Sequence, residues 1–148
     1  MTKFIVVGVD GSQGSHEAVR WSAELASHLG ATVHAVHVES RGSPWEFSVI
    51  QIDITPFLDE VQGLLDGVWT QPLRDAGVTY ETQLLRGDPA TEILGRADQL
   101  DAYLVVAGAR EHTTLPDLLL GGIAHKLANR ANRPVALIPP TTSDRTPT

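Results

Sequence analysis

Short apolar runs recur along this chain, and polar segments separate each run from the next. The runs at 4–9 and 102–107 are continuous, as in strands that are covered on both faces, whereas residues 78–85 alternate between apolar and polar. Two further runs occupy 31–38 and 135–138. The pattern predicts five β-strands.

Helical spacing fills the segment after the first run. Within residues 15–29, Ala18, Ser22, Leu25 and Leu29 recur at positions that share one face of a helix. Either Ser12 or Ser15 is suited to the N-cap of this helix, and Gly30 is suited to its end.

Two more helices are predicted from their starts. Thr55 and Pro56 open a long helix whose shared face carries Leu58, Val61, Leu65 and Val68. Gly63 and Gly67 weaken it by roughly 1 kcal/mol each relative to alanine, and we expect Pro72 to kink or end it. Asp88 and Pro89 form a cap and first turn for a helix that carries Ile93, Leu94 and Ala97.

Strands that alternate with helices favour parallel pairing through right-handed crossovers. We therefore predict an α/β fold, a three-layer α/β/α sandwich around a five-stranded parallel sheet. No internal repeat is visible, so a single domain over residues 1–140 is expected. Residues 39–54 lack a clear period and read as a surface excursion, and residues 141–148 are rich in Pro, Thr and Ser, as in a mobile tail.

Composition narrows the class of protein. The 148 residues are enough for one core, and 42% hydrophobic with 20% charged residues is ordinary for a soluble domain. The absence of cysteine excludes disulfides, thiolate zinc sites and a cysteine nucleophile. A strand pattern from residue 4 leaves no room for a signal peptide, and no apolar run reaches membrane-spanning length, so we expect a cytoplasmic protein without a membrane partner. The net charge of −7 argues against a nucleic-acid partner.

The segment 104–138 carries the most specific motif. An apolar strand runs into Gly108, Glu111 follows three positions later, and after nine residues come Gly121 and Gly122. This spacing resembles the nucleotide loop of the universal stress protein family, whose binding members read G-x-x-G-(x)9-G-[ST]. Two identities depart from that pattern, because Glu111 replaces the second glycine and Gly122 replaces the Ser or Thr.

The resemblance covers nearly the whole chain and implies a Rossmann-like sheet of the adenine nucleotide alpha hydrolase-like type, with strand order 3-2-1-4-5. Ligands of such sheets bind beyond the carboxyl ends of the strands, where the winding reverses. Asp10 then matches the residue on the adenine side, and Val38 the one that packs on the base. The implied nucleotide-binding set is Val9, Asp10, Gly11, Ser12, Val38, Ala107, Gly108, Arg110, Glu111, Gly121, Gly122 and Ile123.

Several of these residues have a plain structural alternative. Asp10 with Ser12 would equally make a turn that caps the next helix. Gly108 suits a tight turn as well as close approach of the backbone to a ligand. Gly121 and Gly122 suit a tight turn as well as a helix N-terminus that presents N–H groups to a phosphate. Losing the hydroxyl at Gly122 removes a donor worth roughly 0.5–1.5 kcal/mol but keeps the backbone donor.

Glu111 is the more serious departure. Its carboxylate about 5 Å from one unit of phosphate charge would cost roughly 3 kcal/mol at an effective dielectric near 20. Arg110 beside it would neutralise either Glu111 or a phosphate, and a Glu111 that faces solvent or shares Mg²⁺ with the phosphates would relieve the repulsion. An ordinary loop residue in a protein that no longer binds triphosphate is the alternative. We predict weakened or altered nucleotide binding.

The chemistry of catalysis is not visible in this sequence. His34 and His37 are three apart on a predicted strand and should face opposite sides, and the other four histidines lack the spacing of a metal site. No P-loop lysine or nucleophile elbow occurs. We therefore expect a protein that acts by binding, without a metal site and without enzymatic turnover, and place a slow nucleotide hydrolase well behind.

The last predicted strand has its own consequence. In the 3-2-1-4-5 order it lies at an edge of the sheet, and apolar edges are normally covered. Family members cover this edge by pairing across a dimer axis, so the resemblance implies a homodimer through Val135, Ala136, Leu137 and Ile138. The hypothesis is a small cytoplasmic stress-response protein that binds ATP, ADP, AMP or cyclic AMP weakly or in altered form. The alternative is a dimeric interaction module that has lost nucleotide binding.

Overall fold

A single sheet of five parallel strands organises the protein, whose computed structural model describes residues 2–40, 53–109 and 120–140. The strands are β1 (Phe4–Gly8), β2 (Thr32–Glu39), β3 (Tyr80–Arg86), β4 (Leu104–Gly108) and β5 (Val135–Ile138), in the order β3-β2-β1-β4-β5. Every predicted strand is confirmed, with ends that agree within two residues, and the predicted strand order is confirmed as well.

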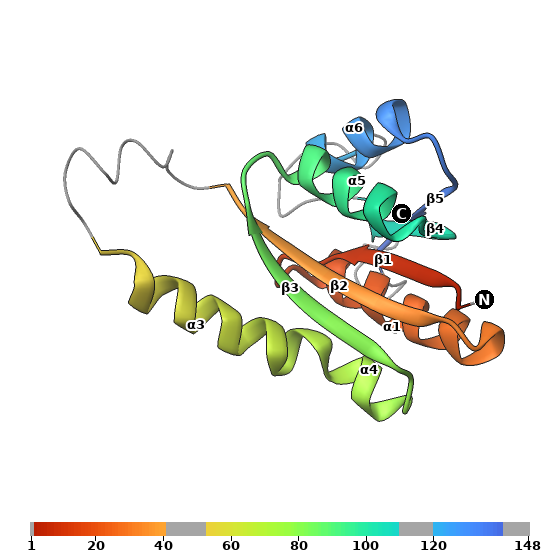
Figure 1. The fold of residues 1–148 in the computed structure, drawn as a ribbon, viewed down its shortest axis with the longest axis horizontal. Helices are drawn as coiled ribbons and strands as arrows, with labels where there is room; N and C mark the ends of the chain where they lie inside the picture. The colour runs from red at the N-terminus through yellow and green to blue at the C-terminus, as the bar shows by residue number, and fades with distance from the viewer. Residues whose placement is uncertain (1, 41–52, 110–119, 141–148) are drawn as a thin grey trace, which may run out of the picture.

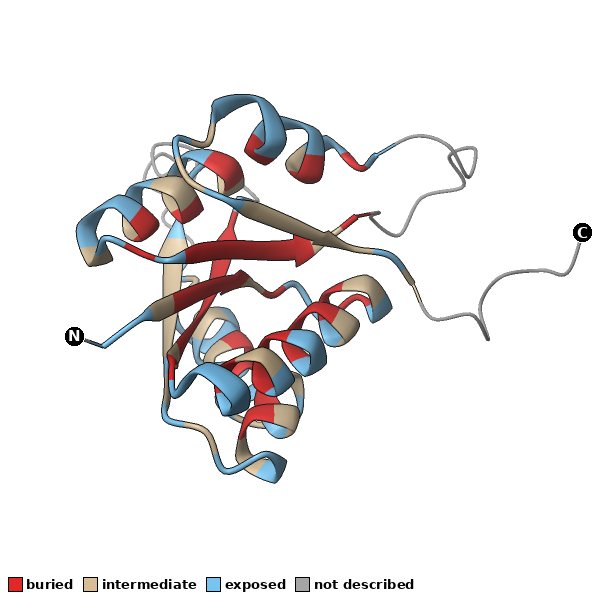
Figure 2. Ribbon diagram, turned by 90° about the vertical axis from the view of Figure 1, so that its right-hand side faces the viewer, coloured by how far each residue is buried: buried red, intermediate tan, exposed pale blue. Residues whose placement is uncertain are grey.

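Helices cover both faces of this sheet, which confirms the three-layer architecture (Figure 1). One face carries α1 (Gln13–Leu29), α3 (Thr55–Asp66), the short 3-10 helix η1 (Val68–Thr70) and α4 (Gln71–Asp75). The other face carries α5 (Pro89–Leu100) and α6 (Gly122–Arg130). The central strands are buried by the two helical layers, as Figure 2 shows, because their side chains alternate between the two apolar clusters.

Local capping explains where two of the helices begin. Of the two serines suited to the N-cap of α1, the structure uses Ser12, whose Oγ accepts from the backbone N–H of Ser15 at 3.1 Å. Gly30 ends α1 in the left-handed conformation, with φ 65°. Asp88 caps α5 by accepting from the N–H of Thr91 at 3.0 Å, as predicted.

The helix that opens at Thr55 and Pro56 is shorter than predicted. It ends at Asp66, and Val68 lies in η1 with 62% of its surface exposed instead of sharing the buried face of Val61 and Leu65. Pro72 does not break the helix, because it occupies the first turn of α4, where its missing N–H costs nothing.

A guanidinium accounts for this early end. Arg74 of α4 donates to the carbonyl of Asp66 at 2.9 Å and to the carbonyl of Gly67, and it also reaches Thr70 and Tyr80. It therefore satisfies the last carbonyls of α3 and allows the chain to turn at Gly67.

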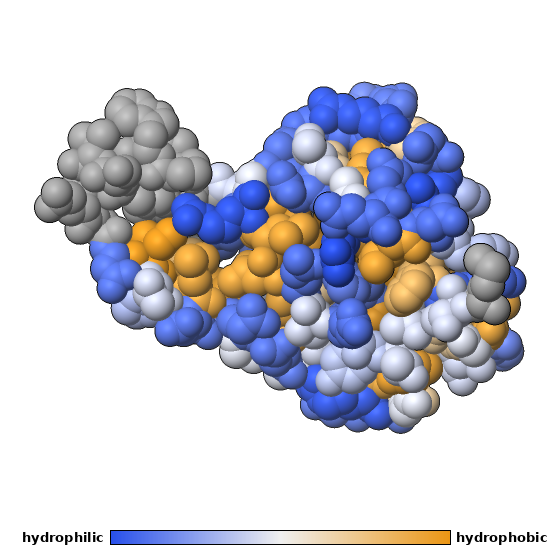
Figure 3. Space-filling view, in the orientation of Figure 1, coloured by the Kyte–Doolittle hydropathy of each residue, from blue (hydrophilic) through white to orange (hydrophobic). Residues whose placement is uncertain are grey.

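Apolar side chains remain at the surface of α3. Phe57 and Leu64 are 37% and 38% exposed, and Figure 3 shows apolar surface over α3 and the neighbouring end of β3. Of the helices in the described ranges, none combines the length and hydrophobicity that a bilayer crossing requires. Of the excursion predicted over residues 39–54, Glu39 belongs to β2 and residues 41–52 lie outside the described residues, as does the predicted tail at 141–148.

Candidate functional site

An open pocket lies at the carboxyl ends of β1, β2 and β4. Its cavity volume of about 450 Å³ falls within the range of small-ligand sites. The strand exits and the first turns of α1, α5 and α6 contribute its walls. The described lining residues are Gly8, Val9, Asp10, Ser12, Ser15, Val36, His37, Val38, Glu39, Ser40, Pro89, Ile93, Ala107, Gly108, Ile123 and Ala124.

The structure brings most of the predicted binding residues together at this pocket. Those that line it are Val9, Asp10, Ser12, Val38, Ala107, Gly108 and Ile123. Gly121 and Gly122 form the start of α6 beside it. Gly11 is absent from the described lining and has the indole of Trp69 at its Cα instead. Arg110 and Glu111 lie outside the described residues.

Asp10 is held in a turn at the mouth of β1. Its Oδ1 accepts from the N–H of Ser12 at 2.9 Å, and its own N–H donates to Ser15 Oγ at 3.3 Å. The structural alternative for Asp10 is therefore present in the molecule. It is compatible with a contact to a ligand, because the side chain is exposed at the pocket and a carboxylate has further acceptor sites.

Gly108 is required by packing within the protein. A Cβ on this residue would lie 2.8 Å from the carbonyl carbon of Gly14, in the first turn of α1. The end of β4 thus passes directly against the backbone of α1. This close approach, which the sequence did not reveal, explains the glycine without any ligand.

Three helices begin at the pocket, and their first turns place N–H groups and the positive ends of their dipoles there. Ser12 and Asp88 cap α1 and α5 with side-chain oxygens. The N-cap of α6 is Gly121, which has no side chain that could cap the helix. The N-cap residue of α6 thus contributes no side-chain oxygen at the start of its helix, unlike those of α1 and α5.

The described lining contains no lysine or arginine. Its ionisable side chains are those of Asp10, Glu39 and His37.

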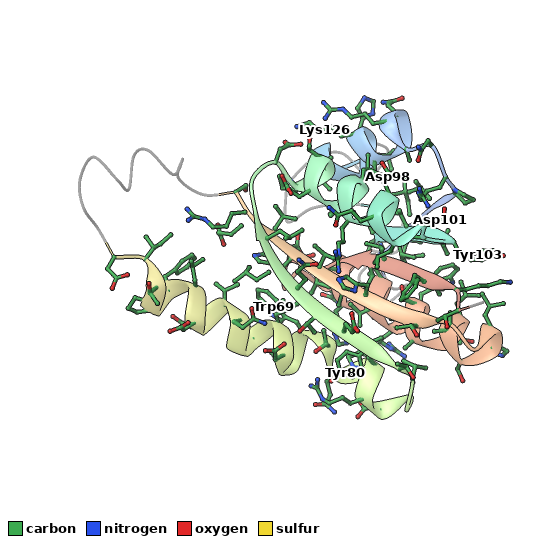
Figure 4. The ribbon with its side chains drawn as sticks, in the orientation of Figure 1. Trp69, Tyr80, Asp98, Asp101, Tyr103 and Lys126 are labelled. Atoms are coloured by element: carbon green, nitrogen blue, oxygen red, sulfur yellow. The ribbon has the colours of Figure 1, made fainter. Side chains whose placement is uncertain are left out.

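Lys126 of α6 (Figure 4) lies 3.6 Å from the capping carboxylate of Asp88, which it helps to neutralise. Hydrogen bonds from the side chain and backbone of Thr91 lower the pKa of Asp88, so this cap is charged at neutral pH.

The two strand histidines point to opposite faces of the sheet, as predicted. His34 contacts Gln83 and Arg96 on the side of α5, whereas His37 contacts Trp69 on the side of α3. Within the described ranges, no three His, Cys, Asp or Glu residues are grouped as metal ligands.

Comparison with known proteins identifies the family to which this fold belongs. The model of the universal stress protein family matches residues 1–139. The chain belongs to the universal stress protein family. Its loop keeps the spacing of the family motif, and α6 begins at Gly122, where the motif has its Ser or Thr.

Relatives of similar length support this membership. The universal stress protein YxiE of Bacillus subtilis is 29% identical over 143 residues, covering 90% of this chain and 97% of YxiE. The universal stress protein MJ0531 of Methanocaldococcus jannaschii is 28% identical, covering 92% and 81% of the two chains. The structure of the universal stress protein from Archaeoglobus fulgidus in complex with dAMP is 27% identical, with a TM-score of 0.71 over 92% of this chain and 97% of that one.

Sequence reasoning missed several residues of the pocket. Ser15, Pro89, Ile93 and Ala124 belong to first turns whose position at the pocket depends on tertiary packing. His37 carried a signal, since a histidine inside an apolar strand needs a hydrogen-bond partner. That partner is the carbonyl of Val9, which only the register of β1 against β2 reveals.

Proposed function

We propose that this protein binds an adenine nucleotide in the pocket at the ends of β1, β2 and β4, and that it acts by binding and not by turnover. The observation that carries the proposal is the placement of Asp10 and Val38 in one pocket with the first turn of α6. The base would lie at Asp10 and Val38, and the phosphate at the N-terminus of α6. The dAMP complex of the Archaeoglobus fulgidus relative supports this assignment.

Binding is weak or altered toward the far phosphates. Gly122 supplies a backbone donor but no hydroxyl, and Glu111 brings a negative charge into the loop. AMP, ADP and cyclic AMP are therefore favoured over ATP, because each phosphate removed reduces the repulsion while the base contacts are kept. Mg²⁺ reduces the difference in affinity between ATP and the ligands with fewer phosphates, because the cation offsets the repulsion between Glu111 and the phosphates.

The first experiment on this proposal is to denature the purified protein and to identify any released nucleotide by its absorbance and chromatographic mobility. Adenine nucleotide in the supernatant supports the assignment, as does a thermal shift with added AMP. A protein that carries none and shifts with none of the adenine ligands is the alternative, a dimeric interaction module of the same family.

The protein is further proposed to be a cytoplasmic homodimer that serves a stress response. In the described sheet β5 pairs only with β4, and all four of its residues are half-buried, so its free edge is suited to pairing with a second copy. Leu137→Asp should yield monomer or aggregate in light scattering. A wild-type monomer at micromolar concentration would contradict the dimer.

A further inference from the structure

The imidazole of His37 links the ends of two strands on the base side of the pocket. Gly8 of β1 is in register with Val36 of β2, so His37 follows opposite Val9. Its Nδ1 lies 2.6 Å from the Val9 carbonyl oxygen, and the residue is only 8% exposed. A carbonyl only accepts, so Nδ1 carries the proton. The N–H of Val9 donates to the Val36 carbonyl at 2.8 Å, so β2 holds both polar groups of Val9.

The orientation of this ring is fixed. Its other nitrogen, Nε2, lies 3.5 Å from the buried carboxylate of Glu39 and makes no hydrogen bond within the described residues. Turning the ring over would put a carbon atom in place of the Nδ1–H that faces the Val9 carbonyl, so this hydrogen bond selects the ring orientation. The ring therefore presents its Nδ1–H to Val9 in one defined geometry.

Trp69 supports the same turn from a second direction. Its ring centroid lies 5.2 Å from that of His37, in a tilted arrangement. The indole also occupies the space beside Gly11, where an added Cβ would lie 2.7 Å from it, and Gly11 has a φ of 79°. Figure 4 labels Trp69, which comes from η1 at the end of α3. The β1–α1 turn, residues 9–12, is thus held by His37 at its first carbonyl and by Trp69 at its glycine.

We propose that His37 is a positioning residue of this pocket: through the Val9 carbonyl it holds the β1–α1 turn in the conformation that presents Asp10 to the base of the ligand. The inference rests on the proposed nucleotide binding for its ligand. In this proposal His37 acts on the ligand indirectly, through its hydrogen bond to the backbone of Val9, whereas Asp10 contacts the base itself.

Two substitutions of similar size separate positioning from packing. His37→Asn keeps an amide N–H close to the place of Nδ1, whereas His37→Gln carries its N–H to the place of Nε2, away from Val9. We expect His37→Gln to lower the affinity for AMP about tenfold in calorimetry, and His37→Asn to stay within about threefold of wild type.

His28 provides a matched control. Its Nδ1 also lies 2.8 Å from a backbone carbonyl oxygen, that of Glu24, but at the far end of α1. His28→Gln removes the same kind of contact and should leave AMP affinity unchanged. Melting temperatures of all variants show which of them remain folded.

Amide hydrogen exchange of residues 10–12 in the ligand-free protein gives a readout that needs no nucleotide. The proposal predicts faster exchange there in His37→Gln than in His37→Asn. Trp69→Phe, which trims the support on Gly11, should also speed it and serves as a second variant if His37→Gln does not fold.

The outcomes separate cleanly. Equal effects of Asn and Gln at position 37, on affinity and on exchange, would assign His37 to packing alone and overturn the proposal. If wild-type protein binds no adenine ligand, the proposed function fails, and the exchange of residues 10–12 then decides the positioning claim by itself.

Discussion

The two sides of the pocket are built by different means. On the proposed base side, buried side chains from distant elements hold a loop: His37 bonds to the Val9 carbonyl, and Trp69 fills the space at Gly11. Around the start of α6, on the proposed phosphate side, the contacts are made by backbone: the N–H of Gly121 donates to the carbonyl of Ala109, and the preceding residue, Gly108, lies against the backbone of Gly14.

This difference determines what a substitution does on each side. A site made of backbone N–H groups keeps its donors when a side chain is lost, so we expect the Gly122 departure to weaken phosphate binding without removing it. A site held by side chains fails when one of them is displaced. Stability should therefore be most sensitive on the base side, and ligand preference should be tuned by charge on the phosphate side.

Gly11→Ala should have the largest effect, about 3 kcal/mol of lost unfolding free energy, because a side chain there is strained by the positive φ and collides with Trp69. Denaturant unfolding measures it. The control is Gly30→Ala, with φ 65° and no atom within 4 Å of its added Cβ, which should lose only about 1 kcal/mol. Equal losses of unfolding free energy in Gly11→Ala and Gly30→Ala would show that the Trp69 side chain moves aside without an energetic cost.

Gly108→Ala tests the backbone packing at the end of β4, where the added methyl meets the backbone of Gly14. We expect a loss of about 2 kcal/mol, since backbone moves less readily than a side chain. Gly95→Ala, in open space on α5, should instead gain up to about 1 kcal/mol in the same unfolding experiment. An unchanged unfolding free energy in Gly108→Ala would mean that β4 and α1 can move apart to accommodate the methyl group without loss of stability.

Glu111→Gly addresses charge in the loop. From the Coulomb estimate, removing the carboxylate should strengthen ATP binding by about one to two decades. Calorimetry on both proteins at matched ionic strength decides the matter. An unchanged affinity would place the carboxylate away from the phosphates.

Asp88→Ala should have the smallest effect, a decrease of a few degrees in melting temperature at pH 7 from the lost cap of α5. Thr91 lowers the pKa of Asp88 from its usual 3.8, so the charged cap contributes fully above that value and its contribution is lost as the pH falls through the folded pKa. The difference from wild type should shrink in acid. In Asp88→Asn the cap residue does not titrate, so its contribution to stability should not change with pH.

Much of the fold could be predicted from the sequence because its signals are local. Apolar runs gave the five strands, and the Asp88–Pro89 pair gave the start of α5. The end of α3 could not be predicted, since it depends on Arg74 reaching back to the carbonyls of Asp66 and Gly67. A helical period continues through Val68 in the sequence, but the chain does not follow it.

The candidate site was predictable only in part, for the same reason. The spacing of the glycines marked the strand exits and the start of α6, which lie at one pocket. The reason for Gly108 lies in Gly14, far away in sequence, and the partner of Gly11 is Trp69, from another element. Such contacts arise from tertiary packing and leave no local signal.

The central claim, an adenine nucleotide bound with its base side intact and its far-phosphate side weakened, is tested most directly by one calorimetric series. Adenosine, AMP, cyclic AMP, ADP and ATP are titrated into wild-type protein, freed of nucleotide, with and without Mg²⁺. We predict that AMP, ADP or cyclic AMP binds more tightly than ATP in the absence of metal, and that Mg²⁺ narrows the gap. Tightest binding of metal-free ATP would contradict the claim.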